Sequence, residues 1–172
     1  MSDWFTADHH FGHANIIEYC NRPFENVDEM NSEMIKRWNE VVQPDDRVFV
    51  IGDFTLGANA ERYGEALAGE MFFIEGSHDH RWFGNVVRWN YLPPLYSLEY
   101  KRKGQHPLVI VLCHYAMRKW DRSHHGSYHL YGHSHGGIAD PLPRSMDIGV
   151  DCHNFYPVHF DTVIALLAQE PE

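Results

Sequence analysis

Short apolar runs alternate with polar, helix-like stretches along the chain. Between residues 27 and 42 the apolar side chains recur with helical spacing, at positions 27, 30, 34, 35, 38, 41 and 42. Residues 59–67 predict a second helix that stops near Gly69, and residues 160–169 predict a last one. The apolar runs predict strands, at residues 4–6, 47–53, 70–76, 95–103, 108–114, 128–133 and 145–151. Residues 81–90 fit a helix or a loop.

This alternation of strands and helices predicts a layered α/β fold. No repeat, low-complexity segment or linker divides the sequence, so we expect a single domain over residues 1–172. The pattern alone does not distinguish two stacked sheets from one doubly wound sheet.

Side chains that could ligate a metal follow five of the predicted strands. They are Asp8 and His10, Asp53, Ser77 and His78, His114, and His133 with His135. Because ligands of α/β sheets bind beyond the carboxyl ends of the strands, these side chains should converge on one site. Residues two apart in an extended chain point to the same side, so Asp8 and His10 can share an ion while His9 faces away. Asp53 alone could equally be a helix cap or turn residue.

The composition is compatible with a metal site, although solvated surface carboxylates and scattered histidines would give the same figures, and it argues against a nucleic-acid surface. The chain has 24 acidic and 14 basic residues, a formal charge of −10, and 14 histidines. Carboxylates and imidazoles suit transition metals, whereas an acidic chain gains nothing from counterion release on a polyanion. Cys20, Cys113 and Cys152 lack the spacing of a disulfide framework or zinc knuckle. No signal peptide or membrane-length apolar run is visible, so we expect a soluble, cytoplasmic protein.

The order of the polar blocks resembles the calcineurin-like metallophosphoesterase family, in particular its small bacterial and phage branch. The blocks are Asp8-His9-His10, Gly52-Asp53, Gly76-Ser77-His78-Asp79, Cys113-His114 and Gly132-His133-Ser134-His135. The resemblance implies two β-sheets packed face to face with helices outside, a four-layer α/β/β/α sandwich. It also implies a phosphoesterase in which a hydroxide bridging two divalent ions attacks phosphorus.

The resemblance assigns a role to each residue of these blocks. Asp8, His10 and His135 correspond to the ligands of one ion, and Asp53 to the carboxylate that bridges both ions. His114 and His133 correspond to ligands of the second ion, with residue 77 completing it. His78 corresponds to the catalytic histidine, and Asp79 to the residue that orients its ring. Manganese is the first candidate for the ions, with iron, zinc, cobalt and nickel as alternatives.

Ser77 departs from the family, which has Asn at this position. A serine hydroxyl reaches less far than an asparagine oxygen and is a weak ligand for a divalent cation. Three alternatives stay open: a water completes the second site, the second ion is weak or absent, or Ser77 is an engineered or inactivating change.

The activity expected from these residues is hydrolysis of a phosphodiester or phosphomonoester, with diesters favoured and a small phosphoester, such as a nucleotide, as substrate. The alternatives are a non-catalytic metal-binding or regulatory protein and a nuclease or RNA-end-processing enzyme. Weaker candidates accompany the site: His13 and Arg22 for substrate contact, His124 and His125 at the rim, and Asp151 as the partner of a ligand histidine. We expect no membrane partner and no extended nucleic-acid surface.

Overall fold

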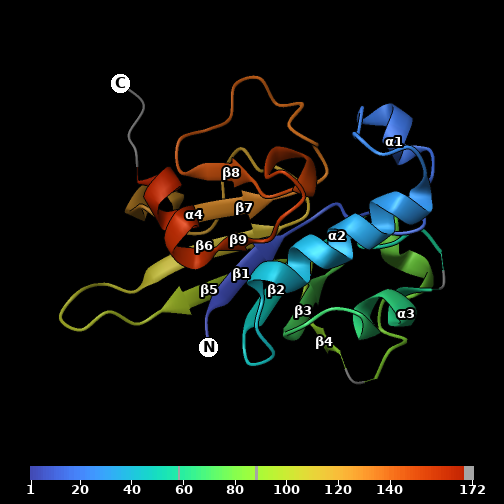
Figure 1. Cartoon of the computed structure of the whole chain (residues 1–172). Coiled ribbons are helices and arrows are strands. Elements are labelled where there is room, and N and C mark those ends of the chain that lie inside the picture. The colour runs from blue at the N-terminus through green and yellow to red at the C-terminus, as the bar shows by residue number, and fades with distance from the viewer. Residues whose placement is uncertain (58, 88, 169–172) are drawn as a thin grey trace.

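The structure is a computed structural model that describes residues 1–57, 59–87 and 89–168 (Figure 1). Its strands form two sheets, one with the order β4-β3-β2-β1-β9 and one with the order β5-β6-β7-β8. The strands of the first sheet are β1 (Asp3–Thr6), β2 (Arg47–Ile51), β3 (Glu70–Ile74), β4 (Asn90–Tyr91) and β9 (Val158–His159). Those of the second sheet are β5 (Leu95–Tyr100), β6 (Leu108–Cys113), β7 (Tyr128–Tyr131) and β8 (Ser145–Asp147).

Both sheets mix parallel and antiparallel strands. β1, β2, β3 and β4 run parallel, and β9 pairs antiparallel with β1 from Trp4 opposite His159. In the second sheet β6, β7 and β8 run parallel, and β5 pairs antiparallel with β6. The two antiparallel strands, β5 and β9, are each an edge strand of their sheet.

The apolar core lies between the two sheets. Phe49 of the first sheet and Ile110 and Leu130 of the second belong to one buried cluster, which Val163 and Leu167 of α4 (Phe160–Leu167) extend. Alternate residues of a strand face opposite sides of the sheet. Phe49 therefore lies on the inner face of β2, while its two neighbours in the strand lie on the outer face.

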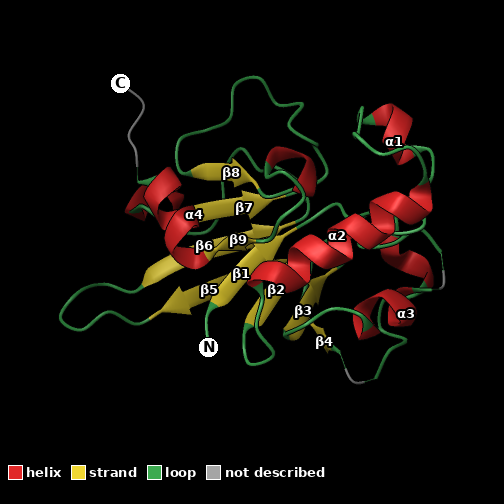
Figure 2. Ribbon diagram, viewed as in Figure 1, coloured by secondary structure: helices red, strands yellow, loops and turns green. Residues whose placement is uncertain are grey.

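Helices cover the outer face of the first sheet (Figure 2). α2 (Val27–Val41) packs Met34 and Trp38 into a second buried cluster with Val48 and Val50 of β2, and Ala60 of α3 (Ala60–Glu65) joins them. The side chain of Asn26 caps α2 by accepting a hydrogen bond from the Glu29 N–H, as its position before an apolar stripe favours.

The outer face of the second sheet is covered by residues 115–127, a loop that contains the 3₁₀ turn η2 (Ser123–His125). The Trp120 ring lies 5.2 Å from that of His129, and the Met117 N–H donates to His129 Nε2. The structure therefore confirms an α/β fold of two packed sheets, with helices on the outer face of the first sheet and a loop on that of the second.

Most predicted elements are present, with shifted ends. α2 ends one residue early, α3 is shorter than expected, and residue 169 of the last predicted helix lies outside the described residues. The described part of 81–90 is mostly turn. Three short elements gave no periodic signal: α1 (Ile16–Tyr19), β4 and β9. Within the described residues, none of the helices has both the length and the apolar character required to span a membrane.

Candidate metal centre

The candidate ligands converge because their strands end at one edge of the molecule. Asp8 follows the end of β1 by two residues, Asp53 follows β2 by two, and His133 follows β7 by two. His114 comes directly after β6. Hydrogen bonds between the loops connect the strand ends, such as the one from the Asp8 N–H to the Gly52 carbonyl and the one from the Gly132 N–H to the His114 carbonyl.

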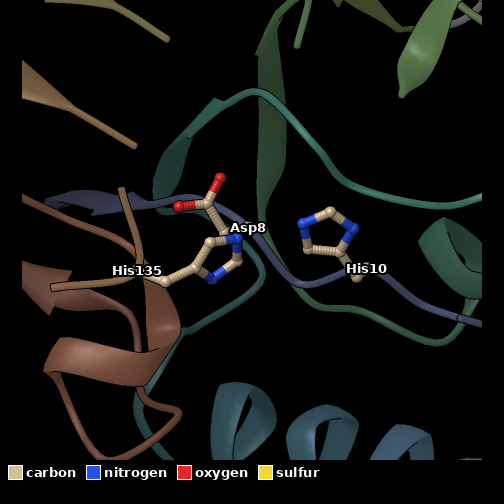
Figure 3. A group of neighbouring side chains, drawn as sticks. All are labelled: Asp8, His10 and His135. Carbon is tan, nitrogen blue, oxygen red and sulfur yellow. The ribbon is translucent and has the colours of Figure 1, made fainter. Parts of the chain in front are cut away.

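Four groups of side chains in the described residues could hold a metal ion, each with its ligand atoms within 4.8 Å of one another, and two of them contain six of the predicted ligands. The first group is Asp8, His10 and His135, which Figure 3 shows side by side, from the loop after β1 and the loop after β7. The second group is Asp53, His114 and His133. These are the two ligand sets implied by the family resemblance, although their role as ligands stays a prediction.

Asp53 lies between the two groups. Its Oδ2 is 3.6 Å from Nε2 of His10, 3.4 Å from Nε2 of His114 and 3.9 Å from Nε2 of His78. One carboxylate therefore faces imidazoles from both groups, which is the geometry required of a bridging ligand.

The nitrogen atoms at the centre suit a metal ion. Among the described residues, Nε2 of His10 and Nε2 of His114 are buried without a hydrogen-bond partner. Nδ1 of His114 donates to the Ile51 carbonyl at 2.9 Å, and Nδ1 of His135 donates to Asp151 Oδ2 at 2.7 Å. Fixing Nδ1 in this way leaves Nε2 as the lone-pair donor, as metal-bound histidines require. The residues present therefore fit one or more divalent transition metals.

Five candidate ligands have left-handed backbone conformations. Their φ angles are 59° at Asp8, 52° at His10, 51° at Asp53, 67° at His133 and 46° at His135. The expectation that Asp8 and His10 share a side because the chain is extended is therefore wrong in its reason, although the two side chains do meet. Non-glycine residues with such angles are uncommon and concentrate at functional sites.

Glycines allow the loops to approach this centre. A Cβ on Gly52, whose φ is +83°, would lie 2.3 Å from Nδ1 of His114, and one on Gly76 would lie 2.4 Å from Oδ1 of Asp53. A Cβ on Gly149 would lie 2.6 Å from Oδ2 of Asp8. Gly149 was missed because it lies outside the recognised blocks, after β8.

Arg22 is buried, and its guanidinium group contacts protein groups, a position that does not favour the expected contact with substrate. Its Nε and Nη2 donate to the two oxygens of Asp151, and Nη1 and Nη2 donate to the carbonyls of His9 and Asp8. Since Nη1 also contacts Met30 Sδ, all five N–H donors are occupied. Arg22 thus fixes the loop after β1, while Asp151 holds His135 as expected.

Asp79 also differs from its expected role. Its carboxylate accepts hydrogen bonds from the N–H groups of Asp53, Phe54 and Gly76 and from the Trp82 indole. These donors occupy the positions through which it would have oriented the His78 ring. Burial raises the pKa of Asp79 to about 6. The hydrogen bonds of the Asp79 carboxylate connect the loop after β2 to the loop after β3.

Ser77 and His78 form the accessible side of the centre. The Ser77 hydroxyl donates to Asp53 Oδ2 at 3.0 Å, and the His78 N–H donates to Asp53 Oδ1 at 2.8 Å. The side chain of His78 is 41% exposed, and its ring centroid lies 5.1 Å from that of His10. His78 can therefore contact a ligand from the solvent side.

The remaining histidines divide into neighbours and distant residues. His13 Nδ1 lies 3.4 Å from His10 Nδ1, so His13 borders the centre as expected. His9 faces away and stacks on Phe11, and burial lowers its pKa to about 3. His124 and His125 precede the start of β7 rather than its end, so they do not form a rim at the centre.

The electrostatics of the two carboxylates differ. Burial raises the pKa of Asp8 to about 7, against the opposing effects of His135 and the His133 N–H. Burial also acts to raise the pKa of Asp53, but the nearby imidazoles of His114 and His10 and the backbone N–H of His78 hold it well below its usual value. In return Asp53 raises the pKa of His114 despite burial. In the metal-free protein the negative charge is therefore concentrated on Asp53.

The fold and site together define a two-sheet α/β protein with a carboxylate–imidazole centre at its strand ends. The chain is 35% identical over 174 residues to the uncharacterized protein MJ1445 of Methanocaldococcus jannaschii, an alignment that covers 95% of this chain and 90% of that one. It belongs to the same protein family as MJ1445.

Two further similarities extend this comparison. The Gene 66 protein of Mycobacterium phage D29 is 27% identical, over 90% of this chain and 91% of its own length. The protein of unknown function AQ665 from Aquifex aeolicus has the same fold, with a TM-score of 0.75 and 18% identity over 96% of this chain and 98% of its own. Comparison with protein-family models gives no match.

Proposed function

We propose that this protein is a metal-dependent phosphoesterase with a preference for phosphodiesters. The observation that carries the proposal is Asp53, whose carboxylate faces unpartnered imidazole nitrogens from two ligand groups. The family resemblance of the five sequence blocks supports the same conclusion. Asp8, His10 and His135 would hold one ion, and His114 and His133 the other, with Asp53 shared and manganese as first candidate.

Divalent ions at such a centre polarise a phosphoryl group and lower the pKa of bound water toward neutrality. The protein contributes position and proton transfer. His78 is fixed through its backbone N–H on Asp53 while its ring stays accessible, so it can donate a hydrogen bond to a phosphoryl or leaving-group oxygen. Ser77 and His133 are also exposed, which leaves room for the second ester group of a diester.

The test measures nitrophenol release from bis(p-nitrophenyl) phosphate and from p-nitrophenyl phosphate, with manganese, zinc, cobalt, nickel or magnesium added to stripped protein. We expect manganese-dependent turnover that is faster for the diester. Asp53→Asn should abolish it, whereas His106→Asn, at an exposed histidine before β6, should not.

A second candidate function is non-catalytic metal binding, favoured by one observation. The Ser77 hydroxyl is hydrogen-bonded to Asp53, so it offers less to a second ion than the family asparagine would. Stoichiometric metal by elemental analysis, together with no turnover of either ester under any ion, would establish this alternative and exclude the phosphoesterase.

A further inference from the structure

An exposed aromatic side chain borders the second ligand group. Tyr115 follows His114 directly, and its ring centroid lies 4.9 Å from that of His114 and 4.8 Å from that of His133, both edge to face. Tyr115 is nevertheless 50% exposed. An aromatic ring in contact with candidate ligands but open to solvent can stack on a planar group of a bound molecule.

A cavity of about 250 Å³ begins at the residue after Tyr115. It is lined by Ala116, Met117, Arg118, Tyr131, Ile138 and Leu142, together with Asp140, Pro141 and Ser145. Tyr131 lines the cavity and lies two positions before His133, so the cavity and the second ligand group share the end of β7.

The lining of this cavity is apolar with two charged residues. Ile138 and Leu142 are among the large hydrophobic side chains exposed on the described surface, and they come from the loop that connects β7 to β8. Arg118 and Asp140 supply one hydrogen-bond donor group and one acceptor group. Binding sites of small organic ligands typically combine an apolar lining with a few polar groups, and those for drug-sized ligands have about 300–1,000 Å³. The smaller volume here fits a single ring system.

We propose that Tyr115 and this cavity form a subsite for a planar, aromatic substituent of the substrate, such as the base of a nucleoside phosphodiester. The inference rests on the proposed phosphoesterase function and specifies its substrate class. The phosphoryl group would lie at the metal centre, and the ring would stack on Tyr115 beside the cavity that Met117 and Ile138 line.

The experiment compares two diesters with the same leaving group, thymidine 5′-(p-nitrophenyl phosphate) and methyl p-nitrophenyl phosphate. Since nitrophenol leaves from both, the chemical step is matched and only the retained group differs. We expect kcat/KM to favour the thymidine ester by about tenfold, mainly through KM, as stacking of one base contributes in other proteins.

The variants locate the source of this preference. Tyr115→Phe keeps the ring and should keep the ratio, whereas Tyr115→Ala and Ile138→Ser should reduce it to about twofold or less. Val87→Ser is the matched control, because Val87 is a fully exposed aliphatic residue outside the cavity. Thermal melts of each variant verify folding.

Three outcomes separate the two proposals. Equal kcat/KM for both esters in the unmodified protein would overturn the subsite and leave the phosphoesterase intact. No turnover of either ester would contradict the phosphoesterase, and the subsite would then be decided by binding. In that case saturation-transfer NMR with methyl thymidine 5′-phosphate should show contact with the base in the unmodified protein and less in Ile138→Ser, and no contact would overturn the subsite as well.

Discussion

The two halves of the candidate centre are built differently. Asp8, His10 and His135 are held from behind by Arg22 and Asp151, whose hydrogen bonds fix two backbone carbonyls and one imidazole. The half around Asp53, His114 and His133 has a buried floor but an open side, where Ser77, His133 and Tyr115 are exposed.

One half of the centre is therefore rigidly held, and the other half is accessible to solvent. In the first half Arg22, Asp151 and His135 are hydrogen-bonded to one another in a largely buried network. We therefore expect an ion bound there to be retained. The second half combines one strongly ionised carboxylate with solvent-facing side chains, so exchange and substrate contact should occur there. The following predictions test this division, beginning with the residue common to both halves.

Asp53→Asn should have the largest effect, because Asp53 serves both halves. We expect kcat/KM on bis(p-nitrophenyl) phosphate to fall by at least about 10³-fold, the upper range for losing one electrostatic stabiliser. Bound metal should fall in parallel by elemental analysis. Two ions per chain and undiminished turnover in this variant would refute the shared role of Asp53.

Arg22→Met should destabilise the protein by about 3–5 kcal/mol, because it leaves the Asp151 carboxylate buried without its cation. Urea denaturation of the metal-free protein measures this loss. Arg62→Met, at an exposed arginine of α3, should change stability little. The double variant Arg22→Met/Asp151→Leu should recover part of the loss, and a double variant less stable than the single one would contradict the buried-pair explanation.

His78→Ala should reduce kcat by about 10²-fold while the metal content stays constant. The effect lies at the low end for general acid–base groups because His78 is partly exposed and water can substitute. Loss of metal together with activity would instead make His78 a ligand, as its position near His10 and Asp53 also allows.

Metal affinity should rise with pH up to about 7. The metal-free protein keeps the Asp8 proton below its raised pKa of about 7, and an incoming ion must displace it. Asp8 alone contributes up to about tenfold in affinity per pH unit below 7, and little above it. Burial acts to lower the pKa values of His114 and His135, but their carboxylate partners raise them overall. These two histidines therefore also make metal affinity increase with pH. Calorimetry in buffers of different ionisation enthalpy should detect proton release at pH 6, and flat affinity between pH 5 and 7 would refute this.

Ser77→Asn should strengthen binding of the second ion by up to about tenfold, the smallest of these effects. Chelator competition measures it, with Ser97→Asn, on exposed β5, as the control. Equal affinity in both proteins would mean that residue 77 does not limit the open half.

The sequence predicts well where the strands end, but it predicts poorly which polar side chains are hydrogen-bonded to one another in the folded protein. The apolar composition of runs such as 47–51 and 108–113 predicts buried strands, and the candidate ligands are the polar residues that follow them. Arg22 and Asp151 are 129 positions apart, so no local pattern reveals their pairing. The role predicted for Asp79 differs for a related reason, because two of its four donors, the N–H groups of Asp53 and Phe54, lie 26 and 25 positions away in the loop after β2.

The left-handed backbone at five candidate ligands has a consequence for evolution and engineering. Each such residue costs of order 1 kcal/mol relative to glycine. Replacing the exposed His133 by glycine would therefore relieve strain while it removes a candidate ligand, whereas glycine at the buried Asp8 or Asp53 would also remove the acceptor of a backbone N–H. A search for thermostable variants that ignores metal binding can therefore accept glycine at position 133 and weaken the proposed metal centre.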